Sequence, residues 1–143
     1  APSTIIRLID MGIQPFLVAS SVVGVISQRL IKQICSNCST AYPANRDELE
    51  ILGMSSEEKV NLYRGRGCAM CGGSGYRGRL GVYEIMVMTS KHKEAICKNC
   101  TEGELRQLSV EHGMKTLRDN ARKFVLSGKT TIEEMIRISY SND

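Results

Sequence analysis

Two stretches of this sequence decide its fold: Cys35-Ser-Asn-Cys38, and Gly67-Cys-Ala-Met-Cys-Gly-Gly-Ser-Gly75. Two thiolates separated by two residues can hold one metal ion from a tight turn, and a second such pair completes a tetrahedron. Glycines beside the second pair can adopt positive φ, which lets backbone N–H groups face the sulfurs. We therefore predict a structural Zn²⁺ site with four ligands: Cys35, Cys38, Cys68 and Cys71. Reduced thiols without a metal are the alternative.

The spacing of the cysteines excludes other readings of the same residues. All six fall in C-x-x-C pairs, whereas the disulfide frameworks of secreted domains rarely confine every cysteine to that spacing. No basic segment followed by an apolar stretch and a cleavage site indicates export. A catalytic zinc is a poorer interpretation, because four protein ligands leave no open position for water or substrate.

The third pair, Cys97-Lys-Asn-Cys100, has no partner pair in the chain. Three roles stay open: a thioredoxin-like redox pair, a half-site shared between subunits, or two incidental thiols. A redox pair should follow a strand and open a helix, whereas this pair closes a run that is compatible with a helix. We therefore favour incidental thiols.

The composition is that of a globular protein. The chain has 143 residues, a formal net charge of +4, 42% hydrophobic residues and 24% charged residues, which excludes wholesale disorder and demands no polyanionic partner. The uncharged stretch from Met11 to Gln28 is interrupted by polar residues and barely reaches the length of a membrane span. We interpret it as a buried or inter-subunit helix.

The first half of the chain is expected to combine helices with a segment, Cys35 to Cys71, that is poor in apolar residues and held by the metal. A short helix is predicted from Ser3 to Gly12, and Pro15 suits the first turn of a second helix that runs to about Ile31. Apolar residues surround this second helix almost completely, which predicts burial. Between the two cysteine pairs, short helices are expected over residues 47–52 and from Met54, with Ser55 as its cap.

One strand and several helices are expected in the second half. Residues 80–88 are apolar on both faces, which predicts a largely covered strand. Helices are expected over residues 90–100, 102–111 and 116–127. A last helix should begin at a Thr130–Glu133 capping box, with inward-facing residues Ile132, Met135, Ile136 and Tyr140.

Together these elements predict a mainly α fold with a small β and zinc-knuckle insertion. The predicted architecture is a helical bundle plus a tetracysteine metal-binding subdomain. Three segments are expected: helices over residues 1–34, the tetracysteine subdomain over 35–79, and a strand with the C-terminal helical bundle over 80–143.

Three other features of the sequence are candidate functional sites. Ser127-Gly-Lys-Thr130 resembles the end of a phosphate-binding loop, but Lys123 stands where that loop needs a glycine, so we expect a helix end here. Arg64, Arg66, Arg77 and Arg79 beside two tyrosines favour a stand-alone zinc-ribbon module that binds nucleic acid, although the weak net charge does not. His92 and His112 lack catalytic partners in the sequence, so no active site is predicted.

Several segments, in this order, resemble the C-terminal part of the type II secretion and type IV pilus assembly ATPases (the PilB/GspE family). The matching pieces are Arg7-Leu-Ile-Asp-Met-Gly12, Pro15-Phe-Leu-Val-Ala-Ser-Ser21, Gln28-Arg-Leu30, Cys35-x-x-Cys38, Gly67-Cys-Ala-Met-Cys71, Gly75-Tyr-Arg-Gly-Arg79, Gly81-Val-Tyr-Glu84, Gly113-Met-Lys-Thr-Leu117 and Gly128-Lys-Thr-Thr-Ile-Glu-Glu134. The resemblance spans nearly the whole chain, and it carries over the four zinc ligands and no catalytic residue. Cys97 and Cys100 are outside the family's pattern.

The resemblance implies a parent protein that is a hexameric ATPase, cytoplasmic and peripheral to the bacterial inner membrane, which assembles pilin or pseudopilin subunits. Its ATP and Mg²⁺ sites would lie in an upstream RecA-like core, and this chain would begin just after the core's histidine box. The implied partners are that core, neighbouring subunits of a homohexamer, and inner-membrane platform or assembly proteins, with no nucleic acid. The chain has no Walker A or B motif, so a structural and coupling role without catalysis is expected.

Overall fold

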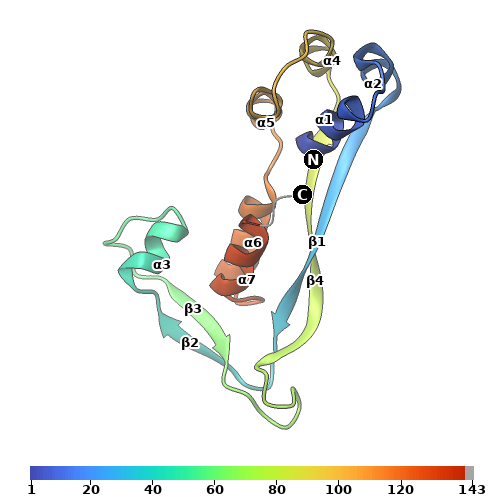
Figure 1. The fold of residues 1–143 in the computed structure, drawn as a ribbon. Coiled ribbons are helices and arrows are strands. Elements are labelled where there is room, and N and C mark those ends of the chain that lie inside the picture. Colours follow the sequence, from blue (N-terminus) through green and yellow to red (C-terminus); the bar gives the residue numbers. More distant parts are fainter. Residues whose placement is uncertain (141–143) are drawn as a thin grey trace. The chain divides into compact units, whose positions relative to one another are not determined.

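The structure is a computed structural model, and it describes residues 1–140. Within that range the chain forms seven helices and four strands, which pair as two separate two-stranded sheets, β1 with β4 and β2 with β3 (Figure 1). The expected mainly α fold is therefore confirmed only in part, because strands make up more of the chain than one insertion. The elements are α1 (Pro2–Asp10), α2 (Pro15–Ser21), β1 (Gly24–Ile34), β2 (Ser39–Pro43), α3 (Arg46–Ile51), β3 (Asn61–Gly65), β4 (Tyr76–Val87), α4 (Ser90–Cys97), α5 (Glu102–Glu111), α6 (Leu117–Leu126) and α7 (Ile132–Ser139).

The chain folds into two compact units. Among the described residues, the first comprises residues 1–28 and 83–116, and the second comprises residues 29–82 and 117–140. The long strands β1 and β4 contribute residues to both units. These units are groups of residues in mutual contact. The predicted division of the chain into segments 1–34, 35–79 and 80–143 stays a prediction.

The first unit has an aliphatic core supplied by four helices and the end of β4. Helix α5 begins at a capping box in which the Thr101 hydroxyl accepts from the Glu104 N–H and the Glu104 side chain accepts from the Thr101 N–H, as the sequence predicts. Burial of the apolar side chains in this core holds the four helices together. The core residues are Ala1, Ile5, Val18, Ala19, Met86, Ile96, Leu105 and Met114.

The predicted helix from Pro15 to Ile31 is wrong in its second half. Helix α2 ends at Ser21, and β1 begins at Gly24. The β-branched residues that follow Ser21 favour an extended backbone, and pairing with β4, far along the chain, stabilises it. The expected burial is wrong as well: Phe16 is 60% exposed and Val23 is 84% exposed.

The strand predicted at residues 80–88 is confirmed as β4, but it is not covered on both faces. Its burial alternates, so that Val82 and Met86 are buried whereas Tyr83, Ile85 and Val87 are exposed. One face of the strand therefore packs on the core and the other is open.

His92 is buried in the first unit and has a packing role. Its Nδ1 accepts from the Thr89 N–H at 3.2 Å, and its Nε2 donates to the Ser109 hydroxyl at 3.1 Å. Ser109 in turn donates to the Leu105 carbonyl at 2.8 Å. Burial, and then the neighbouring His112, lower the pKa of His92, so it stays uncharged. Both ring nitrogens are occupied, and the Ser109 hydroxyl is itself buried and bonded to the Leu105 carbonyl, so the pair serves packing.

The second unit packs α6 and α7 on the sheets and on α3. The predicted helix after Met54 is wrong, because residues 52–60 form turns and irregular backbone. The last helix begins one residue later than expected, since its cap is Thr131, and Tyr140 is 74% exposed and does not face inward. The buried core residues are Ile31, Leu52, Leu62, Val82, Ala121, Val125, Ile132, Met135 and Ile138.

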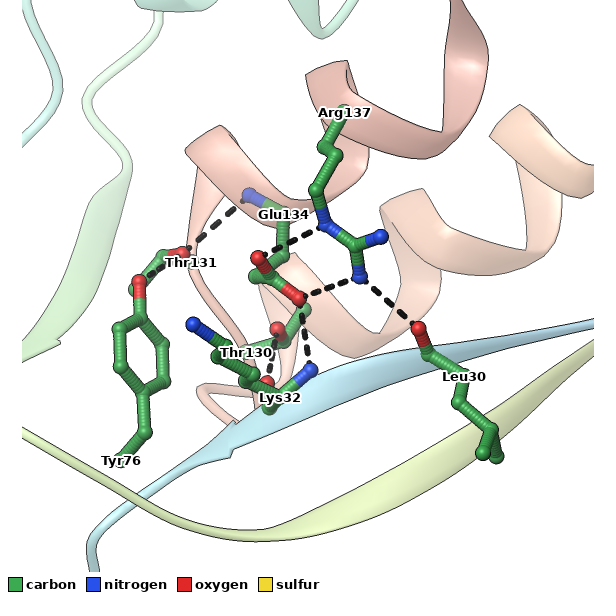
Figure 2. A network of polar contacts seen from close by, with 7 residues as sticks. All are labelled: Leu30, Lys32, Tyr76, Thr130, Thr131, Glu134 and Arg137. Atoms are coloured by element: carbon green, nitrogen blue, oxygen red, sulfur yellow. Dashed lines mark hydrogen bonds and ion pairs between the residues drawn. The ribbon is translucent and has the colours of Figure 1, made fainter. Parts of the chain in front are cut away.

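The loop before α7 and the first turn of α7 cover the edge of β1 (Figure 2). The Lys129 carbonyl accepts from the Ile34 N–H at 2.9 Å, and the Thr130 hydroxyl donates to the Lys32 carbonyl at 2.7 Å. Glu134 accepts from the Lys32 N–H at 2.7 Å. Backbone N–H and C=O groups that would otherwise be unpaired along this edge of β1 are thus hydrogen-bonded to side chains and to the loop backbone.

Arg137 completes this network. It donates to both carboxylate oxygens of Glu134, at 3.1 and 2.9 Å, and to the Leu30 carbonyl at 2.8 Å (Figure 2). Although burial works to raise the pKa of Glu134, the hydrogen bonds from Arg137 and from the Lys32 N–H lower it. Glu134 therefore remains an ionised acceptor for β1.

We predict that Glu134→Ala loosens β1, because the half-buried Lys32 N–H loses its acceptor. The expected loss is about 1–3 kcal/mol of local stability, seen as a faster exchange of the Lys32 amide hydrogen. Glu133→Ala is the matched control, since Glu133 is exposed on the same turn. Equal exchange rates in the two variants would contradict the assignment.

Candidate metal centre

The two C-x-x-C pairs lie in the turns that connect the two sheets. Residues 35–38 join β1 to β2, and residues 66–75 join β3 to β4. In the antiparallel β2–β3 ribbon, Ser39 pairs with Gly65, so the end of the ribbon brings both turns together. Strand pairing between residues far apart in the chain therefore assembles the cluster.

The four sulfurs form one compact group. All of them lie within 4.8 Å of one another. The Sγ–Sγ distances are 3.8 Å for Cys35 and Cys68, 3.8 Å for Cys38 and Cys71, and 3.7 Å for Cys68 and Cys71. A tetrahedron with Zn–S bonds of about 2.3 Å has S–S edges of about 3.8 Å. The donor set and its dimensions fit a four-coordinate zinc ion.

Amide groups point at two of these sulfurs. Cys71 Sγ accepts from the Cys68 N–H at 3.3 Å and from the Gly75 N–H at 3.2 Å, while Cys68 Sγ accepts from the Asn37 side-chain amide at 3.2 Å. The Asn37 bond lowers the pKa of Cys68, and the two N–H donors lower the pKa of Cys71 against the opposing effect of burial. Partial burial raises the pKa of Cys38 to about 11. The 68–71 turn is thus organised for thiolates.

Two glycines let the turns approach each other. A Cβ built on Gly65 would lie 2.1 Å from the Gly75 carbonyl oxygen, and one on Gly75 would lie 2.6 Å from the Gly65 oxygen. The Cys35 N–H donates to the Gly75 carbonyl at 3.0 Å, and the Arg66 N–H donates to the Cys38 carbonyl at 3.2 Å. Backbone contact between the turns sets the spacing of the sulfurs.

Gly65→Ala should separate the two turns, because its methyl group would collide with backbone that cannot rotate away. We expect a loss of about tenfold or more in metal affinity, measured by competition with a zinc chelator. Gly72→Ala is the control: Gly72 has φ +67° but nothing lies within 4 Å of its Cβ, so only backbone strain is added. If the control lost as much affinity, the close approach would not be the cause.

Other residues singled out from the sequence are not drawn into this cluster. Among the described residues the grouping of metal-ligating side chains contains neither Cys97 nor Cys100. Cys97 is exposed at the end of α4, and Cys100 is partly buried beyond a turn in which Asn99 has φ 57°. Their role therefore stays open.

The four arginines near the cysteines are exposed. Arg64 lies over the Tyr42 ring, with 4.1 Å between the guanidinium carbon and the ring centroid, and no ion pair of the described residues includes Arg64, Arg66, Arg77 or Arg79. Binding of nucleic acid by this surface remains the alternative prediction.

Two residues that shape the cluster, Asn37 and Gly65, were not predicted from the sequence. The signal for Asn37 was an amide side chain inside the first C-x-x-C turn. No comparable signal marks Gly65, because its close neighbour Gly75 is set by strand pairing.

Comparison with known proteins places this arrangement in a family. Residues 1–137 match the family described as type II/IV secretion system protein. The chain belongs to this family. The resemblance noted in the sequence to secretion and pilus assembly ATPases is thereby confirmed.

Individual relatives agree. The chain is 40% identical to type II secretion system protein E of Pseudomonas aeruginosa, over 97% of this chain and 28% of the relative. It is 36% identical to the type IV pilus assembly ATPase PilB of Thermus thermophilus, over 95% of this chain and 16% of the relative. It is 33% identical to the type II secretion system ATPase E of Vibrio cholerae, over 97% of this chain and 27% of the relative. The chain thus spans between a sixth and just over a quarter of these relatives. Over residues 1–140, no helix combines the length and the apolar character that crossing a membrane requires.

Proposed function

We propose that this chain is a zinc-bearing, non-catalytic module of an ATPase that drives type II secretion or type IV pilus assembly. Membership of the secretion family and the names of its relatives support the biological setting. The observation that carries the module's own role is the group of four sulfurs at the spacing of a zinc tetrathiolate. Cys35, Cys38, Cys68 and Cys71 would hold the ion, which supplies a crosslink between the ends of two β-ribbons.

The crosslink is needed because the region between the sheets has little else to hold it. The turn residues from 66 to 75 are largely exposed, and their glycines contribute no apolar side chains. Hydrophobic burial therefore adds little to the stability of these turns. Four metal–sulfur bonds replace that missing core, as in other small metal-stabilised subdomains.

An apolar surface on the first unit supports docking on the rest of the parent ATPase. Phe16, Leu17 and Ile26 are exposed, as are Ile85 and Val87 on the open face of β4. We infer that these side chains form one interaction surface, since contiguous exposed apolar patches are typical of such surfaces. We propose that the segment 1–34 packs on the RecA-like ATPase core, where the remaining length of the relatives lies.

In this proposal the chain acts as a structural and coupling element. Its partners are the ATPase core, neighbouring subunits of a homohexamer, and platform or assembly proteins at the inner membrane. The assembly would work at the cytoplasmic side of that membrane. ATP and Mg²⁺ would bind in the parent's core, and no residue of this chain is assigned to catalysis.

The zinc assignment is tested by metal analysis of the purified chain. We expect one zinc per chain, and we expect Cys35→Ser or Cys68→Ser to lose both the metal and the order of residues 35–75, because binding and folding are coupled. Cys97→Ser, which alters an exposed thiol outside the cluster, should keep the metal. The assignment would be overturned if the wild-type chain folded and bound no zinc although zinc was supplied.

A second test concerns catalysis. The chain should release no phosphate from MgATP above the buffer rate, because it has no Walker A glycine loop to cradle the phosphates. Phosphate release is measured with the isolated chain at saturating MgATP. Turnover that persists in constant proportion to this chain through a second purification step would contradict the non-catalytic role.

A further inference from the structure

The four sulfurs of the cluster differ in the number of donors that surround them. Cys71 accepts from the N–H groups of Cys68 and Gly75, and Cys68 accepts from the side chain of Asn37. The 66–75 turn therefore supplies two N–H donors to Cys71, and Asn37 supplies one donor to Cys68 from the opposite turn.

The first turn lacks this support. None of the hydrogen bonds found over residues 1–140 brings an N–H group to Cys38 Sγ. The same holds, over these residues, for Cys35 Sγ. The two halves of the cluster are thus unequal, although their cysteines have the same spacing.

Access to the sulfurs is also unequal. Cys35 is 1% exposed, whereas Cys38, Cys68 and Cys71 are each partly exposed. A reagent from solution therefore reaches three of the four ligands. Of these three, Cys38 has the fewest hydrogen-bond donors.

We propose that Cys38 is the reactive ligand of the centre, the sulfur at which soft electrophiles attack the metal-loaded protein. This inference rests on the proposed zinc function. Donated hydrogen bonds withdraw electron density from a thiolate and weaken it as a nucleophile. Cys68 and Cys71 are quenched in this way, Cys35 is shielded by burial, and Cys38 has neither protection.

Modification of Cys38 would open the centre from one side. When Cys38 Sγ adds to the double bond of N-ethylmaleimide, an S–C bond forms, the bond between this sulfur and the metal breaks, and the adjacent carbon takes a proton from water. The resulting thioether is a much weaker ligand than a thiolate. The 35–38 turn is then released first, while the 66–75 turn keeps its hydrogen bonds from Cys68 and Gly75 to Cys71.

The experiment treats the zinc-loaded chain with a small deficiency of N-ethylmaleimide and maps the label by mass spectrometry on singly modified molecules. Restricting the analysis to single hits excludes thiols that become free after the metal leaves. Cys97, an exposed thiol outside the cluster, gives the rate of an unliganded cysteine in the same sample. Among the four ligands we expect Cys38 to carry about tenfold more label than Cys68 or Cys71.

Asn37→Ala supplies the positioning test. Removing the donor from Cys68 should raise the label at Cys68 severalfold and leave that at Cys97 unchanged. Ser36→Ala is the matched control, because Ser36 is exposed in the same turn and makes no bond to a sulfur. A merely structural effect of Asn37 would raise the label at all four ligands together.

The outcomes separate the inference from the function on which it rests. If the chain holds no zinc and the cluster cysteines react as fast as Cys97, the proposed zinc function fails. If zinc is present but Cys68 or Cys71 is labelled first, or all four ligands are labelled equally, the inference about Cys38 is overturned and the zinc function stands.

Discussion

The meeting of four sulfurs at the ends of two β-ribbons is the constraint on which the second unit depends. Each C-x-x-C turn leads from a strand of one sheet to a strand of the other, so both sheets begin at the cluster. The turns reach contact distance only because Gly65 and Gly75 have no side chains. The paths of β2, α3 and β3 follow from that junction, since the β2–β3 ribbon starts there and α3 lies at its other end (Figure 1).

A second constraint is the covered edge of β1. The segment from Ser127 to Thr130 resembles the end of a phosphate-binding loop, yet the Lys129 carbonyl and the Thr130 hydroxyl are used on β1. Gly128 has φ 80° and lies against the Tyr63 ring, where a Cβ would come within 3.0 Å of a ring carbon. A signal that suggested nucleotide chemistry thus has a structural explanation: the loop replaces a neighbouring strand, and the Arg137–Glu134 pair holds it in place.

The sequence predicted local features well and long-range ones poorly. Helix α5 and its capping box were predicted at the observed residues, because a capping box is a contact between residues three apart. Helix α3 was predicted to within a residue at each end for the same reason. The segment after Ser21 was misassigned, because its apolar residues suit a helix or a strand and the partner strand that decides between them lies more than fifty residues away. The β2–β3 ribbon was missed because its short strands carry little apolar alternation.

The sequence by itself determined which four cysteines are the candidate ligands, since the C-x-x-C spacing is a property of a tight turn and needs no other part of the chain. It also determined the family, because the order of many short motifs is retained along the chain. The tertiary structure alone decided that the four sulfurs lie at tetrahedral spacing, that their hydrogen bonds are unequal, and that β1 is a strand with a covered edge. These features depend on atoms brought together from distant parts of the chain, and distances of that kind are set by strand pairing and close packing.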